Sequence, residues 1–494
     1  MKLENIVHTI ASAGQAKPFA HLTAGALQYK PTRRLLMSYI DRRINQRLEN
    51  AHELNERRPA RVTQDKAYIV QAMAHSIDRA LERGYVSEAV VNGVLRGLVM
   101  NAFLREEHKD AQERFYHEHN SYGPPGFLVI APGKLCNLHC KGCYASSGRD
   151  TEKLDWEVFD RIVTEAQTLW GSGFVVITGG EPLAYRSQGK SVLDMAAKHQ
   201  DMFFLMYTNG TLIDKEVAAR LAEVGNLTPA ISVEGWEERT DTRRGQGTYQ
   251  RVLKAMANLR EVGMPFGISL TATRENCEEL LSDEFLHFFF EEQGAIYGWL
   301  FQYMPIGRGI TLDLLPTPEQ RAWMWQRSWQ IIREKKYFLP DFWNSGTASD
   351  GCISAGRQGG YLYIDWNGKV TPCVFIPYSQ ININEVYAQG GTLSDVLEAP
   401  FFKAIRKWQD DYGYAATKPE ACGNWTMPCI IRDHHADFRR ILAATEPDPE
   451  DKAALHAMTD PTYREGLIKY NEDVARLMDP IWEQKYRKGN GQEP

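Results

Sequence analysis

The chain has 494 residues, of which 43% are hydrophobic, and a formal net charge of −6. This length exceeds one typical domain and supplies a sizeable core, so we expect two or three domains. A slightly acidic chain carries no overall field that would attract nucleic acid or an anionic membrane. The start lacks a signal-peptide pattern, and no apolar run reaches the roughly 18 residues that cross a bilayer, so we expect a cytoplasmic protein.

Eight cysteines are too few for a disulfide scaffold, and in a reducing compartment we expect thiols. Three of them lie close together in the chain, at Cys136, Cys140 and Cys143. Four more follow in the last third of the chain: Cys352, Cys373, Cys422 and Cys429. Cys277 stands alone and is expected to be a buried structural thiol.

Residues 1–122 show helical patterns, no strong strand signal and no cysteine. Within them, residues 33–48 place Leu36, Ile40 and Ile44 on one face of a basic helix. This helix either packs on its own domain with its arginines in water, or meets anionic lipid or an acidic partner as a peripheral membrane contact. Two prolines between glycines then end the helical region at residues 123–126.

Apolar runs of strand type alternate with helical patterns after this boundary. The predicted strands span residues 127–131, 174–178, 203–208, 229–233, 266–271 and 297–303. The predicted helices span residues 156–170, 192–199, 215–224, 249–262 and 280–293. Such alternation indicates an α/β fold with a parallel sheet, either open and doubly wound or a partial barrel. In both, site residues follow the C-terminal ends of the strands.

The first strand is followed by Cys136, Cys140 and Cys143 at C-x3-C-x2-C spacing. Three thiolates cannot complete a tetrahedral zinc site, but they can bind three irons of a [4Fe–4S] cubane and leave the fourth open to a ligand. The second strand is followed by Thr178-Gly-Gly-Glu-Pro182. Its glycines allow the backbone to approach a ligand closely, and its carboxylate suits an ammonium group.

The cysteine loop and the Gly-Gly-Glu-Pro motif together resemble the radical S-adenosylmethionine (SAM) superfamily. The resemblance implies a partial (β/α)6 barrel and a [4Fe–4S] cluster whose open iron binds SAM. It also implies reductive cleavage of SAM to a 5′-deoxyadenosyl radical, which abstracts hydrogen from an unactivated C–H bond. An electron donor such as a flavodoxin or a ferredoxin is the expected partner, and nucleic acid is not.

The same resemblance assigns SAM-binding residues to the strand ends. They are Gly179, Gly180, Glu181 and Pro182 for the amino group, Asn209, Ser232 and Glu234 for the ribose and methionyl part, and Arg244 for the carboxylate, with Arg243 as its alternative. The residue before the third cysteine is often aromatic in the superfamily and supports adenine. Here it is Gly142, with Tyr144 one place after the cysteine.

Candidates for contact with the substrate are Glu234, Tyr303 and Arg308; Tyr303 and Arg308 are alternatively a structural aromatic and a turn arginine. A connector helix is predicted over residues 318–336, because Thr317 and Gln320 form a capping box with proline at the first turn. Its three tryptophans, Trp323, Trp325 and Trp329, form either core or an apolar wall.

Cys352 and Cys373 lie on either side of a predicted hairpin with its turn at Asn367-Gly368, and Cys422 and Cys429 follow later in the chain. Cys352, the hairpin and Cys373 resemble the opening of SPASM or twitch domains, which carry auxiliary clusters. With Cys422 and Cys429 the four cysteines fit one fully ligated [4Fe–4S] cluster. A four-thiolate zinc site is the alternative, as is a site in which Cys422 or Cys429 is free and His434 or His435 replaces it.

We expect five regions in the chain. They are a helical N-terminal region (1–122), a radical SAM partial barrel (123–310), a helical connector (311–350), a SPASM/twitch-like auxiliary cluster domain (351–440) and a helical C-terminal tail (441–494). The resemblance favours modification or cross-linking of a peptide or protein side chain. Radical modification of a lipid or small molecule is the alternative, and a non-catalytic iron–sulfur carrier or scaffold is the alternative from another class.

Overall fold

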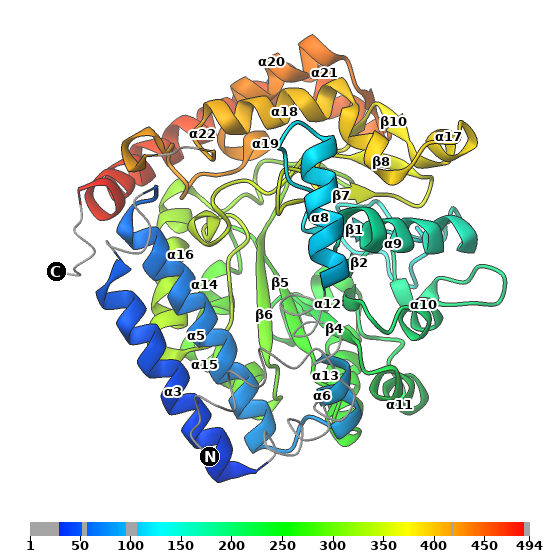
Figure 1. Ribbon diagram of the computed structural model, residues 1–494, viewed down its shortest axis with the longest axis vertical. Coiled ribbons are helices and arrows are strands. Elements are labelled where there is room, and N and C mark those ends of the chain that lie inside the picture. Colours follow the sequence, from blue (N-terminus) through cyan, green and yellow to red (C-terminus); the bar gives the residue numbers. More distant parts are fainter. Residues whose placement is uncertain (1–28, 52–56, 95–105, 416–417, 489–494) are drawn as a thin grey trace.

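The computed structural model describes residues 29–51, 57–94, 106–415 and 418–488, and is built around one nine-stranded sheet (Figure 1). The sheet order is β10-β8-β7-β1-β2-β3-β4-β5-β6. Its six consecutive barrel strands are β1 (Phe127–Ile130), β2 (Phe174–Ile177), β3 (Phe203–Thr208), β4 (Leu227–Val233), β5 (Gly267–Ala272) and β6 (Tyr297–Gln302).

These six strands are parallel, with Val129 opposite Val176 and Ile231 opposite Ile268. Their residues are mostly buried, as expected of parallel strands that are covered on both faces. The predicted α/β fold with a parallel sheet is therefore confirmed. The strands lie within two residues of their predicted positions.

Helices connect the strands on the outside of the sheet (Figure 1). They are α9 (Trp156–Trp170), α10 (Val192–Lys198), α11 (Lys215–Val224), α12 (Glu237–Arg244), α13 (Thr248–Glu261), α14 (Cys277–Leu280) and α15 (Asp283–His287), which continues as a π-helix (Phe288–Glu292). The helix predicted over residues 280–293 is broken, because the Ser282 hydroxyl accepts from Phe285 N–H and starts a new helix there.

The N-terminal helices are α3 (Lys30–Glu49), α5 (Ala60–Glu82), α6 (Glu88–Val94) and α8 (Glu106–Glu118). Helix α3 packs on α5, burying Ile44 and pairing Arg33 with Asp78 at 2.6 Å. The first of the two interpretations of residues 33–48 describes this packing, except that Arg33 is buried rather than in water. Contact with anionic lipid or an acidic partner stays a prediction for the exposed Arg42 and Arg43. None of the described helices is long and apolar enough to cross a membrane.

The predicted hairpin is present as β7 (Tyr361–Ile364) and β8 (Lys369–Thr371), and β10 (Ile381–Asn382) pairs with β8. Strand β7 lies parallel to β1, with Phe127 opposite Tyr361, so the hairpin extends the barrel sheet. A further pair, β9 (Tyr378–Ser379) and β11 (Asp448–Pro449), lies outside this sheet. Residues on both sides of the predicted boundary at residue 351 therefore belong to the same sheet. The division into five regions stays a prediction.

The remaining helices lie beyond the barrel strands in the chain. They are α16 (Pro318–Gln330), which continues as a π-helix (Ile331–Lys335), α17 (Ile383–Ala388), α18 (Pro400–Asp411), α19 (Ile430–Asp433), α20 (His435–Thr445), α21 (Lys452–Thr459) and α22 (Pro461–Trp482). The capping box of α16 has the predicted form, since Thr317 and Gln320 bond reciprocally.

A second hydrophobic core, separate from that of the sheet, joins α16, α22 and α5. Trp325 and Trp329 of α16 are buried in it beside Trp425 and Trp482, whereas Trp323 is 37% exposed. Two of the three connector tryptophans are therefore core residues. This packing places the π-helix Glu483–Arg487, which continues α22, against α5.

Candidate functional site

One cavity of about 580 Å³, the central cavity, is lined by residues along the barrel strands and at their C-terminal ends. Residues discussed in the sequence analysis that line it are Cys136, Cys140, Gly142, Cys143, Tyr144, Gly179, Gly180, Asn209, Ser232, Arg243, Arg244, Tyr303, Cys352, Cys373 and Cys429. Five further candidates do not appear in its lining: Glu181, Pro182, Glu234, Arg308 and Cys422. Both cysteine groups thus open onto the same space.

Cys136, Cys140 and Cys143 form the loop site, on the segment between β1 and α9. The backbone of this loop is tied to its neighbours: Cys136 N–H donates to Gly148 O at 2.6 Å and Lys141 N–H donates to Arg243 O at 2.9 Å. Asn209 Nδ2 approaches Cys136 Sγ at 3.8 Å. Burial raises the pKa of the Cys136 thiol to about 11 and also raises that of Cys140. The thiols are therefore held in a preformed loop.

Arg308 donates hydrogen bonds to backbone carbonyls of the loop that carries the three cysteines. Its guanidinium donates to Cys140 O at 2.8 Å and to Ser147 O, and its backbone N–H donates to Cys143 O at 2.9 Å. These three bonds clamp the loop to the segment after β6. The geometry gives Arg308 a positioning role, whereas its contact with the substrate stays a prediction without support from the cavity lining.

The glycines of the Gly-Gly-Glu-Pro motif allow two loops to touch. A Cβ on Gly180 would lie 2.3 Å from the carbonyl oxygens of Lys134 and Leu135, and one on Gly179 would lie 2.6 Å from Gly133 O. Gly179 also has a φ of +122°, which favours glycine. The motif therefore approaches the cysteine loop itself as well as the cavity.

The Glu181 carboxylate is occupied within the protein. It accepts hydrogen bonds from Leu183 N–H at 3.1 Å, Thr208 Oγ1 at 2.7 Å and Asn209 N–H at 2.8 Å. Burial raises its pKa above the ordinary value. Glu181 thereby joins the ends of β2 and β3, and its bond to the SAM ammonium remains a prediction.

Two arginines share one buried carboxylate at the end of β4. Arg243 and Arg244 both donate to Glu234, whose side chain is 1% exposed. Burial acts to lower the pKa of the Arg244 guanidinium, but the charge of Glu234 holds it above the ordinary value. Both arginines line the central cavity, whereas Glu234 lies behind them. Glu234 therefore orients the two arginines, and their positively charged side chains form part of the cavity wall.

Tyr303 lies beside the glycine that differs from the superfamily pattern. Gly142 has a φ of +64°, and a Cβ on it would lie 3.1 Å from Cε2 of the Tyr303 ring. Tyr303 is 2% exposed and lines the central cavity just after β6. The ring thus fills the space that a side chain at position 142 would enter.

Cys352, Cys373 and Cys429 form the C-terminal cysteine site, and each comes from a different segment. Cys373 Sγ lies 2.9 Å from the Tyr361 hydroxyl, and Cys352 Sγ lies 3.1 Å from the Ser354 hydroxyl. Burial raises the pKa of Cys373 to about 12. Burial and the Asp433 carboxylate raise the pKa of Cys429. All three thiols line the central cavity.

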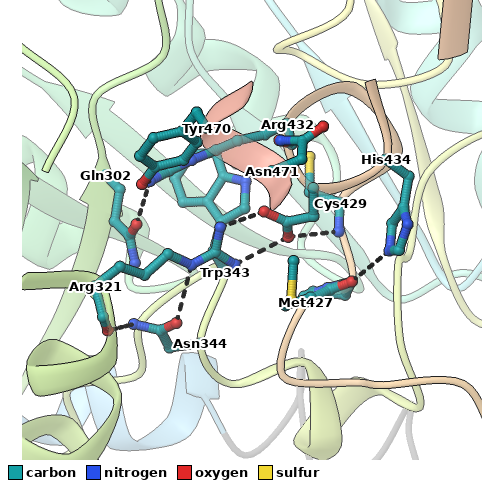
Figure 2. A network of polar contacts seen from close by, with 12 residues as sticks. Gln302, Arg321, Trp343, Asn344, Met427, Cys429, Arg432, His434, Tyr470 and Asn471 are labelled. Atoms are coloured by element: carbon teal, nitrogen blue, oxygen red, sulfur yellow. Dashed lines mark hydrogen bonds and ion pairs between the residues drawn. The ribbon is translucent and has the colours of Figure 1, made fainter. Parts of the chain in front are cut away.

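A buried ion pair holds the third segment of this site (Figure 2). Arg321 of α16 donates through both terminal nitrogens to the Asp433 carboxylate, and both side chains are fully buried. Asp433 Oδ2 also accepts from Cys429 N–H at 3.0 Å. The pair therefore fixes the backbone of Cys429 to helix α16.

Arg432, the residue before Asp433, makes further contacts that hold the segment after Cys429 in place (Figure 2). Its Nη2 donates to Gln302 Oε1 at 2.6 Å and to the Tyr470 hydroxyl at 2.9 Å, and its guanidinium lies 5.2 Å from the Trp343 ring centroid. Gln302 ends β6 and lines the central cavity. This contact connects the barrel to α19 and α22.

Cys422 does not line the central cavity, unlike the other three C-terminal cysteines, although Cys352 packs against the same second hydrophobic core. Cys422 is fully buried in this core, and its thiol points to Lys418 O at 3.7 Å. His434 Nε2 is bonded to Met427 O and His435 Nδ1 to Ile431 O, each at 2.8 Å, and neither ring lines the central cavity. The structure therefore brings together three of the four predicted ligands.

The residues present fit iron–sulfur clusters better than single metal ions. A structural zinc ion holds its thiolates about 2.3 Å away, and among the described residues no three His, Cys, Asp or Glu side chains surround one such point. A cubane is a larger body, so its three cysteines stand farther apart. Both cysteine sites present three thiols to an open cavity with room beside them. This donor set suits a cluster with a ligand at the remaining iron.

The sequence analysis missed the polar residues that support the C-terminal cysteine site. Arg321 and Asp433 are 112 positions apart, and Arg432 and Gln302 are 130 apart. Their one local signal was the pair Arg432-Asp433 directly after Ile430 and Ile431, because charges beside a buried apolar run need partners. Which partners they take depends on the fold.

Known proteins with similar sequences support the same conclusion. The profile of the Radical SAM superfamily matches residues 130–282. Mycofactocin maturase MftC of Mycolicibacterium smegmatis is 30% identical over 331 residues, which cover 64% of this chain and 79% of that protein. The AdoMet-dependent heme synthase of Methanosarcina barkeri is 27% identical over 278 residues, covering 51% of this chain and 77% of that protein.

Streptococcus suis SuiB bound to precursor peptide SuiA aligns with a TM-score of 0.49 and 17% identity, over 69% of this chain and 83% of that chain. The family assignment depends on the sequence relatives, because the identity to MftC extends over most of that protein's length. By this relationship and the profile match, the chain belongs to the radical SAM superfamily.

Proposed function

We propose that this enzyme abstracts hydrogen from a peptide or protein side chain and completes the oxidation or cross-linking of that side chain in the central cavity. The superfamily uses a [4Fe–4S] cluster and SAM, which together supply a 5′-deoxyadenosyl radical. One observation carries the proposal: the loop site and the C-terminal cysteine site line the same cavity. A substrate bound there lies within reach of both.

The loop site would hold the cluster that binds SAM, and the residues around it would bind the rest of the cofactor. Arg244, oriented by Glu234, presents a positive charge at the cavity wall and suits the SAM carboxylate. Asn209 and Ser232 line the same wall at the ends of β3 and β4. Gly179 and Gly180 leave backbone groups accessible to the ammonium.

Tyr303 would support the adenine of SAM. It is an aromatic ring on the cavity wall directly beside Gly142, at the position where the superfamily commonly has an aromatic residue. A base stacked on an aromatic ring gains about 1–3 kcal/mol of binding free energy. This arrangement accounts for the glycine before the third cysteine.

The remaining cavity wall excludes water from the reacting atoms. Aromatic side chains from several strands, from the segment after α16 and from the loop after β8 line it: Phe127, Phe174, Tyr207, Trp299, Phe301, Phe338, Phe342, Trp343 and Phe375. An apolar wall protects a carbon radical from side reactions. The volume of about 580 Å³ lies within the range of small-molecule sites. SAM fills part of it, so the room left suits one side chain of a larger substrate.

The relationship to a maturase supports a peptide or protein substrate. A cluster at the C-terminal cysteine site would accept the electron that an oxidised product leaves behind. The electron for SAM cleavage would come from a flavodoxin or a ferredoxin, as the resemblance implies.

A lipid or small-molecule substrate is the second candidate. The aromatic lining of the cavity and the relationship to an AdoMet-dependent heme synthase support it. Deuterium distinguishes the two candidates: the substrate is the labelled compound whose deuterium moves into 5′-deoxyadenosine.

Anaerobic reconstitution with iron, sulfide, dithionite and SAM tests the radical step. We expect 5′-deoxyadenosine and methionine in equal amounts, detected by chromatography and mass spectrometry. Replacing Cys136, Cys140 and Cys143 by alanine is the matched control. A fully loaded cluster that forms no 5′-deoxyadenosine would contradict the proposal.

A further inference from the structure

We propose that the auxiliary cluster of this enzyme has three protein ligands, Cys352, Cys373 and Cys429, and that its fourth iron faces the central cavity and binds a nitrogen, oxygen or sulfur atom of the substrate. Cys422 is then a structural thiol. This inference rests on the proposed function, because it takes the C-terminal cysteine site to hold a cluster. It concerns how the substrate is held.

The three thiols share one wall of the cavity although their segments are distant in the chain. Cys352 precedes the hairpin, Cys373 follows β8 and Cys429 precedes α19. Hydrogen bonds hold all three segments: Ala355 N–H donates to Pro372 O at 2.8 Å, which joins the Cys352 segment to the Cys373 segment, and the Asp433 carboxylate accepts from Cys429 N–H. The site is therefore formed by the folded protein and points into the space where SAM and substrate meet.

Cys422 is held away from this wall. Its carbonyl accepts from Arg487 Nη2 at 2.8 Å, and the next residue, Gly423, donates its N–H to Tyr412 O at 3.0 Å. The chain packs so closely here that a Cβ on Gly413 would lie 2.2 Å from Ala421 O. Moving Cys422 into the cavity would therefore require this core to be rebuilt.

The carboxylates and imidazoles that could replace a fourth cysteine are either engaged within the protein or absent from the cavity lining. The Asp433 carboxylate pairs with Arg321, and His434 Nε2 bonds to a backbone carbonyl. His435 Nδ1 also bonds to a backbone carbonyl; its Nε2 has no hydrogen-bond partner among the described residues, but the ring does not line the central cavity. Asp341 lines the cavity, but its oxygens accept from Gln302 Nε2, Asn344 Nδ2 and the N–H groups of Trp343 and Asn344. The fourth iron is thus left to a ligand from the cavity.

Ser345 is a second, independent sign of a polar ligand in the central cavity. It lies on the segment that leads to Cys352, is 8% exposed and lines the central cavity. Its Oγ is buried and has no hydrogen-bond partner among the described residues. A buried hydroxyl without a partner is costly, and a polar group of a bound substrate would satisfy it.

The closing experiment isolates the auxiliary cluster in the full-length chain. In the Cys136→Ala/Cys140→Ala/Cys143→Ala background the loop site holds no cluster, so a reconstituted [4Fe–4S] site accounts for about four irons per chain. Adding Cys422→Ser should leave iron, sulfide and the electron paramagnetic resonance spectrum of the reduced cluster unchanged. Adding Cys429→Ser, the matched control, should lower the iron content or convert the spectrum to that of a three-iron cluster.

A second measurement needs no substitution in the C-terminal half. Carbon-13-labelled cyanide, added to the reduced background protein, should produce a carbon-13 hyperfine coupling in pulsed resonance spectra, because an open iron binds it. Absence of this coupling, or loss of iron in the Cys422→Ser variant, would overturn the inference while leaving the auxiliary cluster in place. Zinc in place of iron in the background protein would instead overturn the auxiliary cluster itself.

Discussion

Cys136, Cys140 and Cys143 come from one short loop, whereas Cys352, Cys373 and Cys429 come from three separate segments. Backbone hydrogen bonds and glycine contacts from neighbouring loops hold the first group, and a buried ion pair with α16 helps to hold the second. A loop can lose its cluster while the barrel around it remains. The C-terminal cysteine site forms only when its three segments have packed together. Its buried ion pair in turn helps to hold those segments to α16.

The largest contrast is expected when one cysteine of each site is replaced. Cys140→Ala should abolish 5′-deoxyadenosine formation, because the cluster that binds SAM loses a ligand. Cys373→Ala should retain SAM cleavage but form no modified product. Both are measured in one assay, by quantifying 5′-deoxyadenosine and product after anaerobic incubation. If Cys373→Ala abolished cleavage as well, the two sites would not have separate roles.

Arg321→Met tests whether the C-terminal cysteine site is part of the core. The change leaves the buried Asp433 carboxylate without its partner, and breaking a buried pair from one side costs about 3–5 kcal/mol. We expect a large drop in the apparent midpoint of urea unfolding, and partial recovery in the Arg321→Met/Asp433→Leu double variant.

The control for this prediction lies on the same helix. Arg327 pairs with Asp283, whose side chain is 67% exposed. Arg327→Met should therefore cost less than about 1 kcal/mol. Equal effects of the two arginine replacements would show that the buried pair has no special role.

Gly180→Ala tests whether the loop site can be disturbed without destabilising the fold. The new methyl would lie 2.3 Å from two backbone oxygens of the cysteine loop, so the loop must move. We expect about a hundredfold loss of 5′-deoxyadenosine formation, equivalent to about 2.7 kcal/mol, with an unfolding midpoint close to that of the wild type.

Gly133→Ala is the matched control, since its Cβ would meet its nearest neighbour at an ordinary 3.4 Å. It should retain most of the activity. If both alanine variants lost activity to the same degree, contact between the two loops would not be the cause.

The difference between the two sites also explains what the sequence could reveal. The strands and most helices were predictable because apolar residues recur with strand or helix periodicity, and the loop site because its three ligands are adjacent in the chain. Cys422 could not be separated from Cys429 by spacing, since tertiary packing places one in the second core and the other at the cavity. The break at Ser282 was missed because a single hydroxyl cap interrupts an otherwise helical pattern.

Tyr303→Leu is expected to have a moderate effect at the loop site only. Loss of ring stacking should raise the KM for SAM about tenfold, which corresponds to about 1.4 kcal/mol. Tyr303→Phe keeps the ring and should retain a KM near that of the wild type. SAM titrations of 5′-deoxyadenosine formation measure both. An unchanged KM in the leucine variant would remove Tyr303 from the adenine site.

The smallest expected effect concerns the pH dependence of the C-terminal region. Burial lowers the pKa of His435 from 6.5 to about 4, with the charge of Arg439 acting in the same direction. As the pH falls below 6.5, the unfolded chain gains a proton that the folded chain binds only near pH 4, so the free energy of unfolding decreases.

Between pH 7.5 and 5.5 this decrease amounts to about 1.4 kcal/mol. His435→Gln has no group that titrates there, so the fall in its unfolding midpoint between these two pH values should be smaller than in the wild type. His456→Gln, at an exposed position of α21, provides the surface control. An identical fall in wild type and His435→Gln would mean that His435 takes up its proton without unfolding, and that the start of α20 is more open to water than its packing indicates.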